Sequence, residues 1–286
     1  MKKVITFIGA GNMARSLIAG LIQDEADLQI RIADPENSQL QSIQTSWQGI
    51  AAFSDNIEAV AGTNTADHAN NTDNAADVVV LAVKPQIMQA VCEPLKAAVL
   101  EHNPLIISIA AGISIDSLQQ WLGGKDKSLP IVRCMPNTPA LVQSGMTGLY
   151  ANPQVTGAQK DLAESILRAV GSTLWLDNED KLDAVTAVSG SGPAYYFLVM
   201  EAMQNAAQKL GLSAEDSRLL VLQTAFGAAK LALESTDDAA TLRQRVTSKG
   251  GTTEAALKEL IDGGLPELFE KALQAAENRS RELKKL

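Results

Sequence analysis

Residues 4–22 have the sequence VITFIGAGNMARSLIAGLI, and this stretch determines how the first half of the chain folds. The opening run is apolar and rich in β-branched residues, which predicts a buried parallel strand. A turn containing two glycines follows. The apolar residues after it have the spacing of one helical face. The stretch therefore predicts a strand, a tight loop and a helix.

The turn contains the pattern G-x-G-x-x-A, in which each small residue has a physical role. Gly9 permits the sharp turn, Gly11 lacks the Cβ that would keep a pyrophosphate away from the backbone, and Ala14 lets the helix pack closely on the strand. The first N–H groups of the helix then face the anion. An ordinary tight turn is the alternative, but the position directly after a strand favours a dinucleotide site.

The composition limits the class of protein. A chain of 286 residues is long enough for two domains, and a formal net charge of −9 with scattered Lys and Arg argues against a nucleic-acid partner. Cys92 and Cys134 form no disulfide or zinc pattern, so no metal is expected. Two thiols without an export signal indicate the cytoplasm. No apolar run reaches the roughly 18 residues that a membrane span needs.

Strands and helices alternate up to about residue 176. Further strands are predicted at residues 28–33, 49–53, 77–83, 105–109 and 130–134, with weaker ones at 146–150 and 173–176. Helices between such strands predict a parallel sheet. Residues 62–74 are rich in Asn, Thr and Ala and have no apolar period, so we expect a solvated insertion there.

The second half of the chain is predicted to be helical throughout. The helix after Gly192-Pro193 is apolar nearly all round, and such a helix must be buried on every side. One small domain cannot enclose it, so we expect a second subunit to cover part of it. The fold class is therefore α/β followed by all-α, with a Rossmann-like dinucleotide-binding domain at residues 1–176 and a helical dimerisation domain at residues 177–286.

Asp34 lies 20 residues after Ala14, directly after the second predicted strand. A nucleotide-binding fold places an acid at this distance to accept hydrogen bonds from the adenosine ribose. Because a carboxylate repels a 2′-phosphate, Asp34 taken alone favours NADH over NADPH. Capping of the helix that starts near Glu36 is an alternative that is compatible with the ribose role.

Two glycine-containing segments open helices in the second half. SGSGPAY at residues 189–195 places serine hydroxyls and N–H groups at a helix start, which suits an anion or a cofactor amide. A flexible turn between domains is the alternative. GGTT at residues 250–253 suits a substrate carboxylate with a threonine hydroxyl beside it. Helix capping by Thr252 or Thr253 would need no ligand.

The chain lacks the loop G-x-x-x-x-G-K-[ST] and the elbow G-x-S-x-G, which argues against nucleotide hydrolysis and against a serine nucleophile. With the glycine turn, AVKP at residues 82–85, MPNTP at 135–139, SGSGPAY and GGTT in this order, the chain resembles pyrroline-5-carboxylate reductase. The likeness extends from Lys3 to about Leu283. It implies an oxidoreductase that reduces 1-pyrroline-5-carboxylate to L-proline with NADPH, or with NADH, and homodimers that often assemble into decamers.

The resemblance also implies site residues, position by position. The cofactor site comprises Ile8, Gly9, Ala10, Gly11, Asn12 and Met13 at the pyrophosphate, Asn56 beside Asp34 at the adenosine, and Ala82, Val83, Lys84, Pro85, Ala110, Ala111 and Gly112 at the nicotinamide. The substrate site lies between the helical domains of two subunits and comprises Ser191, Val246, Gly251, Thr252 and Thr253. Thr253 is the implied proton or hydrogen-bond donor, Ser189 borders the nicotinamide and the imine, and Glu179 is an acid on the substrate side.

Four alternatives remain open. Asn74 is a rival to Asn56, although it lies very close to a strand. Asp34 departs from members that prefer NADPH, which usually have small hydroxyl or basic residues there, and only Arg31 is nearby. A β-hydroxyacid dehydrogenase would need a lysine on the apolar helix, which has none before Lys209. A nucleotide-sensing protein without turnover is the rival outside enzymes.

Overall fold

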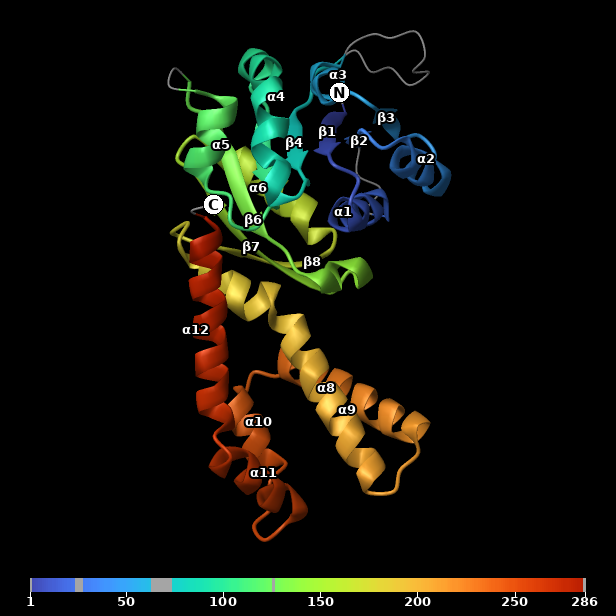
Figure 1. Cartoon of the computed structure of the whole chain (residues 1–286), viewed down its shortest axis with the longest axis vertical. Helices are drawn as coiled ribbons and strands as arrows, with labels where there is room; N and C mark the ends of the chain where they lie inside the picture. The colour runs from blue at the N-terminus through green and yellow to red at the C-terminus, as the bar shows by residue number, and fades with distance from the viewer. Residues whose placement is uncertain (1, 24–27, 63–73, 125–126, 285–286) are drawn as a thin grey trace. The chain divides into compact units, whose positions relative to one another are not determined.

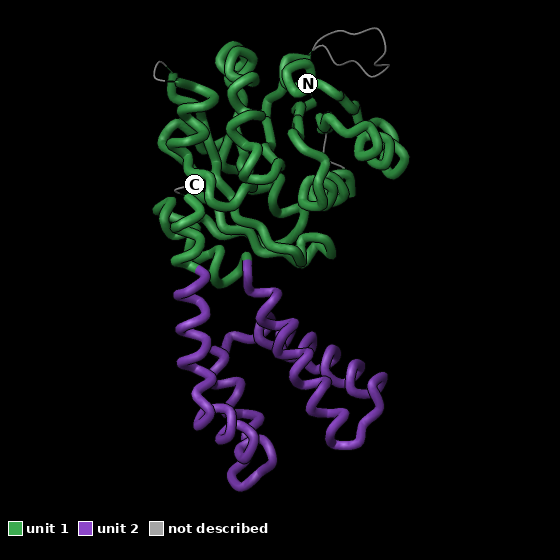
Figure 2. Tube along the Cα trace, viewed as in Figure 1, with its two compact units in different colours: residues 1–190, 277–286 green, residues 191–276 purple. Residues whose placement is uncertain are grey.

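The computed structural model describes residues 2–23, 28–62, 74–124 and 127–284. The chain forms two compact units, one of residues 1–190 with 277–286 and one of residues 191–276 (Figure 2). The sequence instead predicts a boundary between residues 176 and 177. The compact units differ because residues 177–190 and the last helical turn pack with the sheet. The compact units do not test where the dimerisation domain begins, so its predicted start at residue 177 stays a prediction.

Contacts at the end of the chain explain this division. Asp183 is buried, with 1% of its surface exposed, and its carboxylate accepts a hydrogen bond from Ser280 Oγ at 2.8 Å. Lys284 Nζ lies 2.6 Å from the same carboxylate. A Cβ added to Gly112 would lie 3.3 Å from Leu283 Cβ. The last turn of the chain is therefore part of the first unit.

Within the described residues, the first unit is built on an eight-stranded sheet of order β3-β2-β1-β4-β5-β6-β7-β8 (Figure 1). The strands are β1 (Lys3–Ile8), β2 (Leu28–Ala33), β3 (Ala51–Phe53), β4 (Val78–Leu81), β5 (Leu105–Ser108), β6 (Ile131–Met135), β7 (Gly145–Ala151) and β8 (Gly171–Trp175). The predicted parallel arrangement is confirmed for β1 to β6. β7 is antiparallel to β6 and parallel to β8. The link between β6 and β7 is too short for the crossover that parallel strands need.

Helices cover both faces of this sheet (Figure 1). One face packs against α1 (Asn12–Gln23), α2 (Asn37–Ser46) and α6 (Gly157–Arg168), and the other against α3 (Asn56–Ala61), α4 (Met88–His102) and α5 (Ile115–Leu122). Successive strand residues alternate between the two faces: Val78 and Val80 contribute to the first cluster, Val79 and Leu81 to the second. Burial on both faces is why these strands are continuously apolar in the sequence.

The second unit is helical. It contains α8 (Gly192–Lys209), α9 (Ala214–Glu234), α10 (Ala239–Arg245), α11 (Thr252–Asp262) and most of α12 (Leu265–Leu283). On α8, Tyr196, Phe197 and Leu198 are 70%, 63% and 66% exposed in the single chain. Contiguous apolar exposure of this kind marks a surface that another chain covers. The apolar helix that the sequence predicts is present, and its unburied face is the reason to expect a partner subunit.

Two expectations concern membrane spans and the insertion. In the part of the chain that the structure describes, no helix combines the length and apolar character that crossing a membrane requires. The solvated insertion expected at residues 62–74 falls largely on residues 63–73, which lie outside the described residues.

Candidate active site

The loops that carry the predicted cofactor residues meet at one edge of the sheet. Because β2, β1, β4 and β5 are parallel neighbours, their carboxyl ends lie side by side. Residues 8–13, 34, 82–85 and 110–112 follow these ends. The strand order reverses between β1 and β4, which is where open α/β sheets bind their ligands. Asn56 begins α3 after the neighbouring β3 and therefore lies at the same edge.

Gly9 and Gly11 serve different purposes in the turn after β1. Gly9 has φ +101° and donates its N–H to Ala33 O at 2.8 Å. A Cβ on Gly9 would lie 2.9 Å from both Ala82 O and Val83 Cγ1. A Cβ on Gly11 would meet nothing within 4 Å, directly before α1 begins. The first N–H groups of a helix have no partner within it. The open backbone at Gly11 and this helix start fit a pyrophosphate.

This difference predicts opposite results for two alanine substitutions. Gly11→Ala is expected to keep the melting temperature of wild type and to weaken dinucleotide binding about tenfold or more, because the methyl group occupies the anion's place. Gly9→Ala is expected to destabilise the fold by about 1–3 kcal/mol, through its positive φ and the close contacts with the loop after β4. Thermal unfolding and cofactor titration of both variants test this pair. Equal melting temperatures would contradict the role assigned to Gly9.

Asp34 braces the glycine turn. Its Oδ2 accepts a hydrogen bond from the Ala10 N–H at 2.8 Å, and its Oδ1 accepts one from the Glu36 N–H at 2.9 Å. α2 begins at Asn37 with Glu36 as its N-cap residue, so the expectation that Asp34 caps this helix is wrong. Each carboxylate oxygen has a second lone pair. Asp34 can therefore brace the turn and still accept a hydrogen bond from a ribose hydroxyl.

Arg31 is bonded to Asn74, which precedes β4. Arg31 is fully buried, and its guanidinium donates to Ala59 O at 3.2 Å and to Asn74 O at 2.6 Å. Burial lowers the pKa of this guanidinium. Asn74 precedes the amino end of β4, whereas the loop of Ala82 follows its carboxyl end. Asn56 thus lies at the same edge of the sheet as Asp34 and Asn74 at the opposite edge, and the adenosine role of Asn56 stays a prediction.

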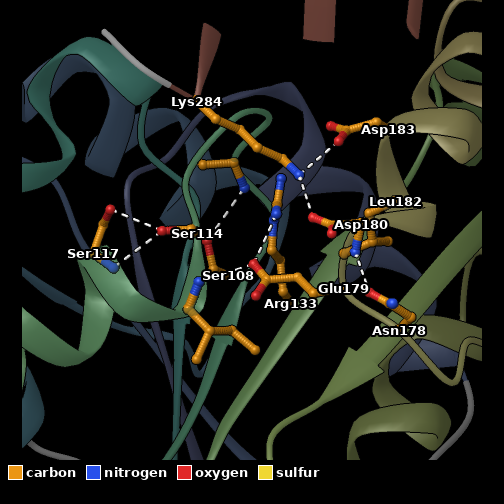
Figure 3. A network of polar contacts seen from close by, with 12 residues as sticks. Ser108, Ser114, Ser117, Arg133, Asn178, Glu179, Asp180, Leu182, Asp183 and Lys284 are labelled. Carbon is orange, nitrogen blue, oxygen red and sulfur yellow. Dashed lines mark hydrogen bonds and ion pairs between the residues drawn. The ribbon is translucent and has the colours of Figure 1, made fainter. Parts of the chain in front are cut away.

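Glu179 belongs to a polar network near residues 110–112, which are predicted to line the nicotinamide (Figure 3). Its Oε1 accepts hydrogen bonds from Arg133 Nη1 at 2.8 Å and from the Ile115 N–H at 2.9 Å. The Arg133 side chain is only 4% exposed, and a buried guanidinium requires a charged partner. Glu179 thus ties β6 to the start of α5, directly after residues 110–112. Arg133 was not predicted from the sequence, and the substrate role of Glu179 stays a prediction.

Ser189 lies in a π-helical turn (Thr186–Gly190) that precedes α8. Asn137 Nδ2 donates to Ser189 O at 3.1 Å and to Ser189 Oγ at 3.2 Å. π-helical turns occur frequently at functional sites. The MPNTP motif is recognisable in the sequence, but no role for Asn137 was predicted from it. A polar residue directly after a strand end, at the binding edge of the sheet, was the available signal.

The predicted substrate residues lie in the second unit. Gly251 is the N-cap residue of α11, and no side chain caps this helix. Thr252 and Thr253 are its first two residues, so the expectation that one of them caps the helix is wrong. Gly250 has φ +72°, and its N–H donates to Glu254 Oε2 at 2.7 Å. The helix start keeps its first N–H groups for an anion.

The surroundings of α11 extend this part of the site. Gly250, Gly251 and Glu254 line a hollow of about 470 Å³ together with Thr247 and Lys258. Val246 ends α10, and Ser191 precedes α8. These residues belong to the same unit as Thr253.

Within the described residues, the two cysteines and the possible metal ligands indicate whether thiol or metal chemistry is available. Cys92 and Cys134 are free and buried. Burial raises the pKa of the Cys92 thiol to about 12, with a further contribution from Glu93, and burial also raises the pKa of Cys134. Both thiols therefore stay protonated and are poor nucleophiles. Over the described ranges, no group of His, Cys, Asp and Glu has the arrangement of a metal site.

Comparison with known proteins connects these features. The family described as "Pyrroline-5-carboxylate reductase dimerisation" matches residues 179–283, and the family described as "NADP oxidoreductase coenzyme F420-dependent" matches residues 4–112. The helical unit and the sheet unit each correspond to one of these matches. The predicted fold class, an N-terminal Rossmann-like domain and a C-terminal helical dimerisation domain, is confirmed.

Individual relatives extend over nearly the whole chain. Pyrroline-5-carboxylate reductase of Pseudomonas aeruginosa is 54% identical over 280 residues, which cover 98% of this chain and 96% of the relative. The solved structure of the Coxiella burnetii enzyme is 47% identical, with a TM-score of 0.90 and coverage of 100% of both chains. The Plasmodium falciparum enzyme, solved with NADP bound, is 28% identical with a TM-score of 0.80 and coverage of 99% and 98%. This oxidoreductase chain belongs to the pyrroline-5-carboxylate reductase family.

Proposed function

We propose that the protein reduces 1-pyrroline-5-carboxylate to L-proline, the last step of proline biosynthesis, with NADPH or NADH as the reductant. The observation that carries this proposal is the start of α11, where Gly251 takes the N-cap position without a side-chain cap and Thr253 is the second helical residue. An anionic substrate that also needs a hydrogen-bond donor fits this arrangement. Membership of the reductase family supports the same substrate.

The residues of α11 then have distinct tasks. A bound reduced nicotinamide supplies the hydride to the imine carbon C5. The N–H groups of Thr252 and Thr253 bind the substrate carboxylate, and the Thr253 hydroxyl donates to the ring nitrogen. Because an ordinary threonine is a weak acid, this donation is a hydrogen bond to a nitrogen that becomes basic as the carbon is reduced, with water completing the proton transfer. Fixed positions of the two reacting carbons supply much of the rate.

A spectrophotometric assay tests the proposal. Oxidation of NADPH or NADH by 1-pyrroline-5-carboxylate, with L-proline as the product, is expected. Oxidation of a 3-hydroxy acid without imine reduction would favour a β-hydroxyacid dehydrogenase. Cofactor binding without turnover of either substrate would favour a nucleotide-sensing protein.

The carboxylate of Asp34 is expected to influence the preference between NADPH and NADH. Asp34→Ser is expected to raise the ratio of kcat/KM for NADPH to that for NADH about tenfold, because the carboxylate no longer repels the 2′-phosphate. Arg31 cannot offset this repulsion while it is bonded to Ala59 O and Asn74 O. Steady-state rates with both cofactors measure the ratio.

Asp77→Ser is a matched control for this measurement, because Asp77 also accepts a backbone N–H, that of Val4 at 2.9 Å, but lies before the amino end of β4. Asp77→Ser is expected to leave the cofactor ratio unchanged. An unchanged ratio in Asp34→Ser as well would remove Asp34 from the discrimination.

We infer further that the protein acts in the cytoplasm as a homodimer, and that dimers assemble into decamers. The dimerisation family match and the exposed apolar face of α8 support the dimer. The resemblance to the reductases supports the decamer. Sedimentation velocity separates the two assemblies by mass.

A further inference from the structure

Asn137 has an amide group whose orientation is determined by its neighbours. Its Oδ1 accepts a hydrogen bond from the Met146 N–H at 2.9 Å. A backbone N–H can only donate, so the oxygen of the amide must face Met146 and the nitrogen must face Ser189. Nδ2 then donates to Ser189 O and Ser189 Oγ at 3.1 and 3.2 Å.

This orientation determines what the Ser189 hydroxyl can do. A hydroxyl has one hydrogen to donate and two lone pairs that accept. Asn137 occupies a lone pair of Ser189 Oγ and offers it no acceptor, so the hydrogen of Ser189 has to point elsewhere. Ser189 is half-buried, and over the described ranges Asn137 is the partner of its Oγ. The hydroxyl is left as a directed donor.

The location of this donor indicates its acceptor. Asn137 follows the carboxyl end of β6, the neighbour of β5, whose own end leads into residues 110–112. The proposed function places the nicotinamide along that loop and the substrate carboxylate at α11. The nicotinamide ring carries one carbonyl oxygen, in its carboxamide group, which can accept a hydrogen bond from a hydroxyl.

We propose that Asn137 is a positioning residue that orients the Ser189 hydroxyl to donate a hydrogen bond to the carboxamide oxygen of the nicotinamide. This inference rests on the proposed function for the place of the nicotinamide. Asn137 itself acts only through Ser189, and its bond to the Met146 N–H near the start of β7 holds it in place.

Asn137→Asp tests the proposal in the full-length chain, because it keeps an acceptor for the Met146 N–H and removes only the donor to Ser189. Ser189 then gives its hydrogen to the new carboxylate. The variant is expected to bind NADPH about tenfold more weakly. It should bind 2′-phospho-ADP-ribose, which lacks the nicotinamide, as wild type does. Ser189→Ala is expected to show the same pattern.

The double variant of Asn137→Asp and Ser189→Ala separates positioning from two independent contacts. If Asn137 acts through Ser189, the combined loss of NADPH affinity stays about tenfold, and does not become about a hundredfold. Titration calorimetry with both ligands gives all the required dissociation constants.

Asn152→Asp is the matched control. Asn152 Oδ1 accepts the Ile131 N–H at 3.1 Å and its Nδ2 donates to Leu129 O at 2.8 Å, so it makes the same kinds of bonds at the other end of β6. Asn152→Asp is expected to leave NADPH affinity unchanged. If Asn137→Asp fails to fold, Asn137→Ala replaces it, because it also removes the donor.

Three results would overturn the inference: unchanged NADPH affinity in a folded Asn137 variant, an equal loss for both ligands, or losses that multiply in the double variant. These measurements are independent of the reaction. If the variants lose affinity for NADPH alone but the wild-type protein reduces no imine, the proposed function is refuted and the inference stands. If the wild-type protein reduces the imine but the variants show no loss that is specific to NADPH, the inference is refuted and the proposed function stands.

Discussion

Thr253→Ala is expected to lower turnover about 100-fold or more while the dissociation constant of the nicotinamide cofactor stays close to that of wild type. Donation of a hydrogen by a positioned side chain typically contributes a factor of about 100 to 10,000. Gly251, and not a threonine, is the N-cap residue of α11, so the substitution removes no capping bond. The loss therefore falls on the reaction, and stopped-flow rates with a separate cofactor titration measure the two effects.

Two further variants accompany this test. Thr253→Ser keeps the hydroxyl and is expected to retain most of the activity. Thr241→Ala removes a hydroxyl from the first turn of α10, whose Thr241 N–H donates to Asp238 Oδ1 at 2.7 Å, and is expected to leave turnover near wild type. An equal fall in turnover and cofactor affinity in Thr253→Ala would refute the role of Thr253 as a donor.

Phe197→Asp is expected to separate the dimer into single chains and to reduce turnover at least as strongly as Thr253→Ala. Phe197 is 63% exposed on α8, between Tyr196 and Leu198, which are exposed to a similar extent. Burial of a large apolar side chain contributes about 1.5–3 kcal/mol, and a carboxylate at the same place must be desolvated without a partner. Because we expect two subunits to form the substrate site, loss of the dimer removes activity as well.

Light scattering after size-exclusion chromatography gives the mass of the Phe197 variant. Gln208→Asp adds the same charge near the end of α8, at an exposed polar position, and is expected to stay dimeric. A single chain that turns over at the wild-type rate would show that the active site is complete in one subunit.

Local features of the site were accessible from the sequence because short-range sterics and periodicity determine them. The turn at Gly9 is recognisable from one strand, two glycines and one helix that are contiguous in the sequence, and its positive φ is present as the pattern requires. The strand that ends before Ala82 is continuously apolar because it is buried on both faces. The start of α11 was located through its glycines, although the cap residue is Gly251 and not a threonine.

Contacts between distant segments could not be derived in the same way. Asn137 and Ser189 are 52 residues apart, and Arg133 and Glu179 are 46 residues apart. Their meeting depends on β7 running antiparallel to β6, which brings the following segment back over the sheet. The apolar pattern of β7 is the same for either direction, so strand periodicity carries no information about it.

Asp183 is bonded to residues that are translated long after it. The ribosome synthesises residues 191–276 between Asp183 and its two partners, Ser280 and Lys284. Before Ser280 and Lys284 have been synthesised, the Asp183 carboxylate lacks both of these partners, and burying it without a cation would be strongly destabilising. The sheet unit therefore acquires the Ser280 and Lys284 contacts of Asp183 only after the helical unit has been made.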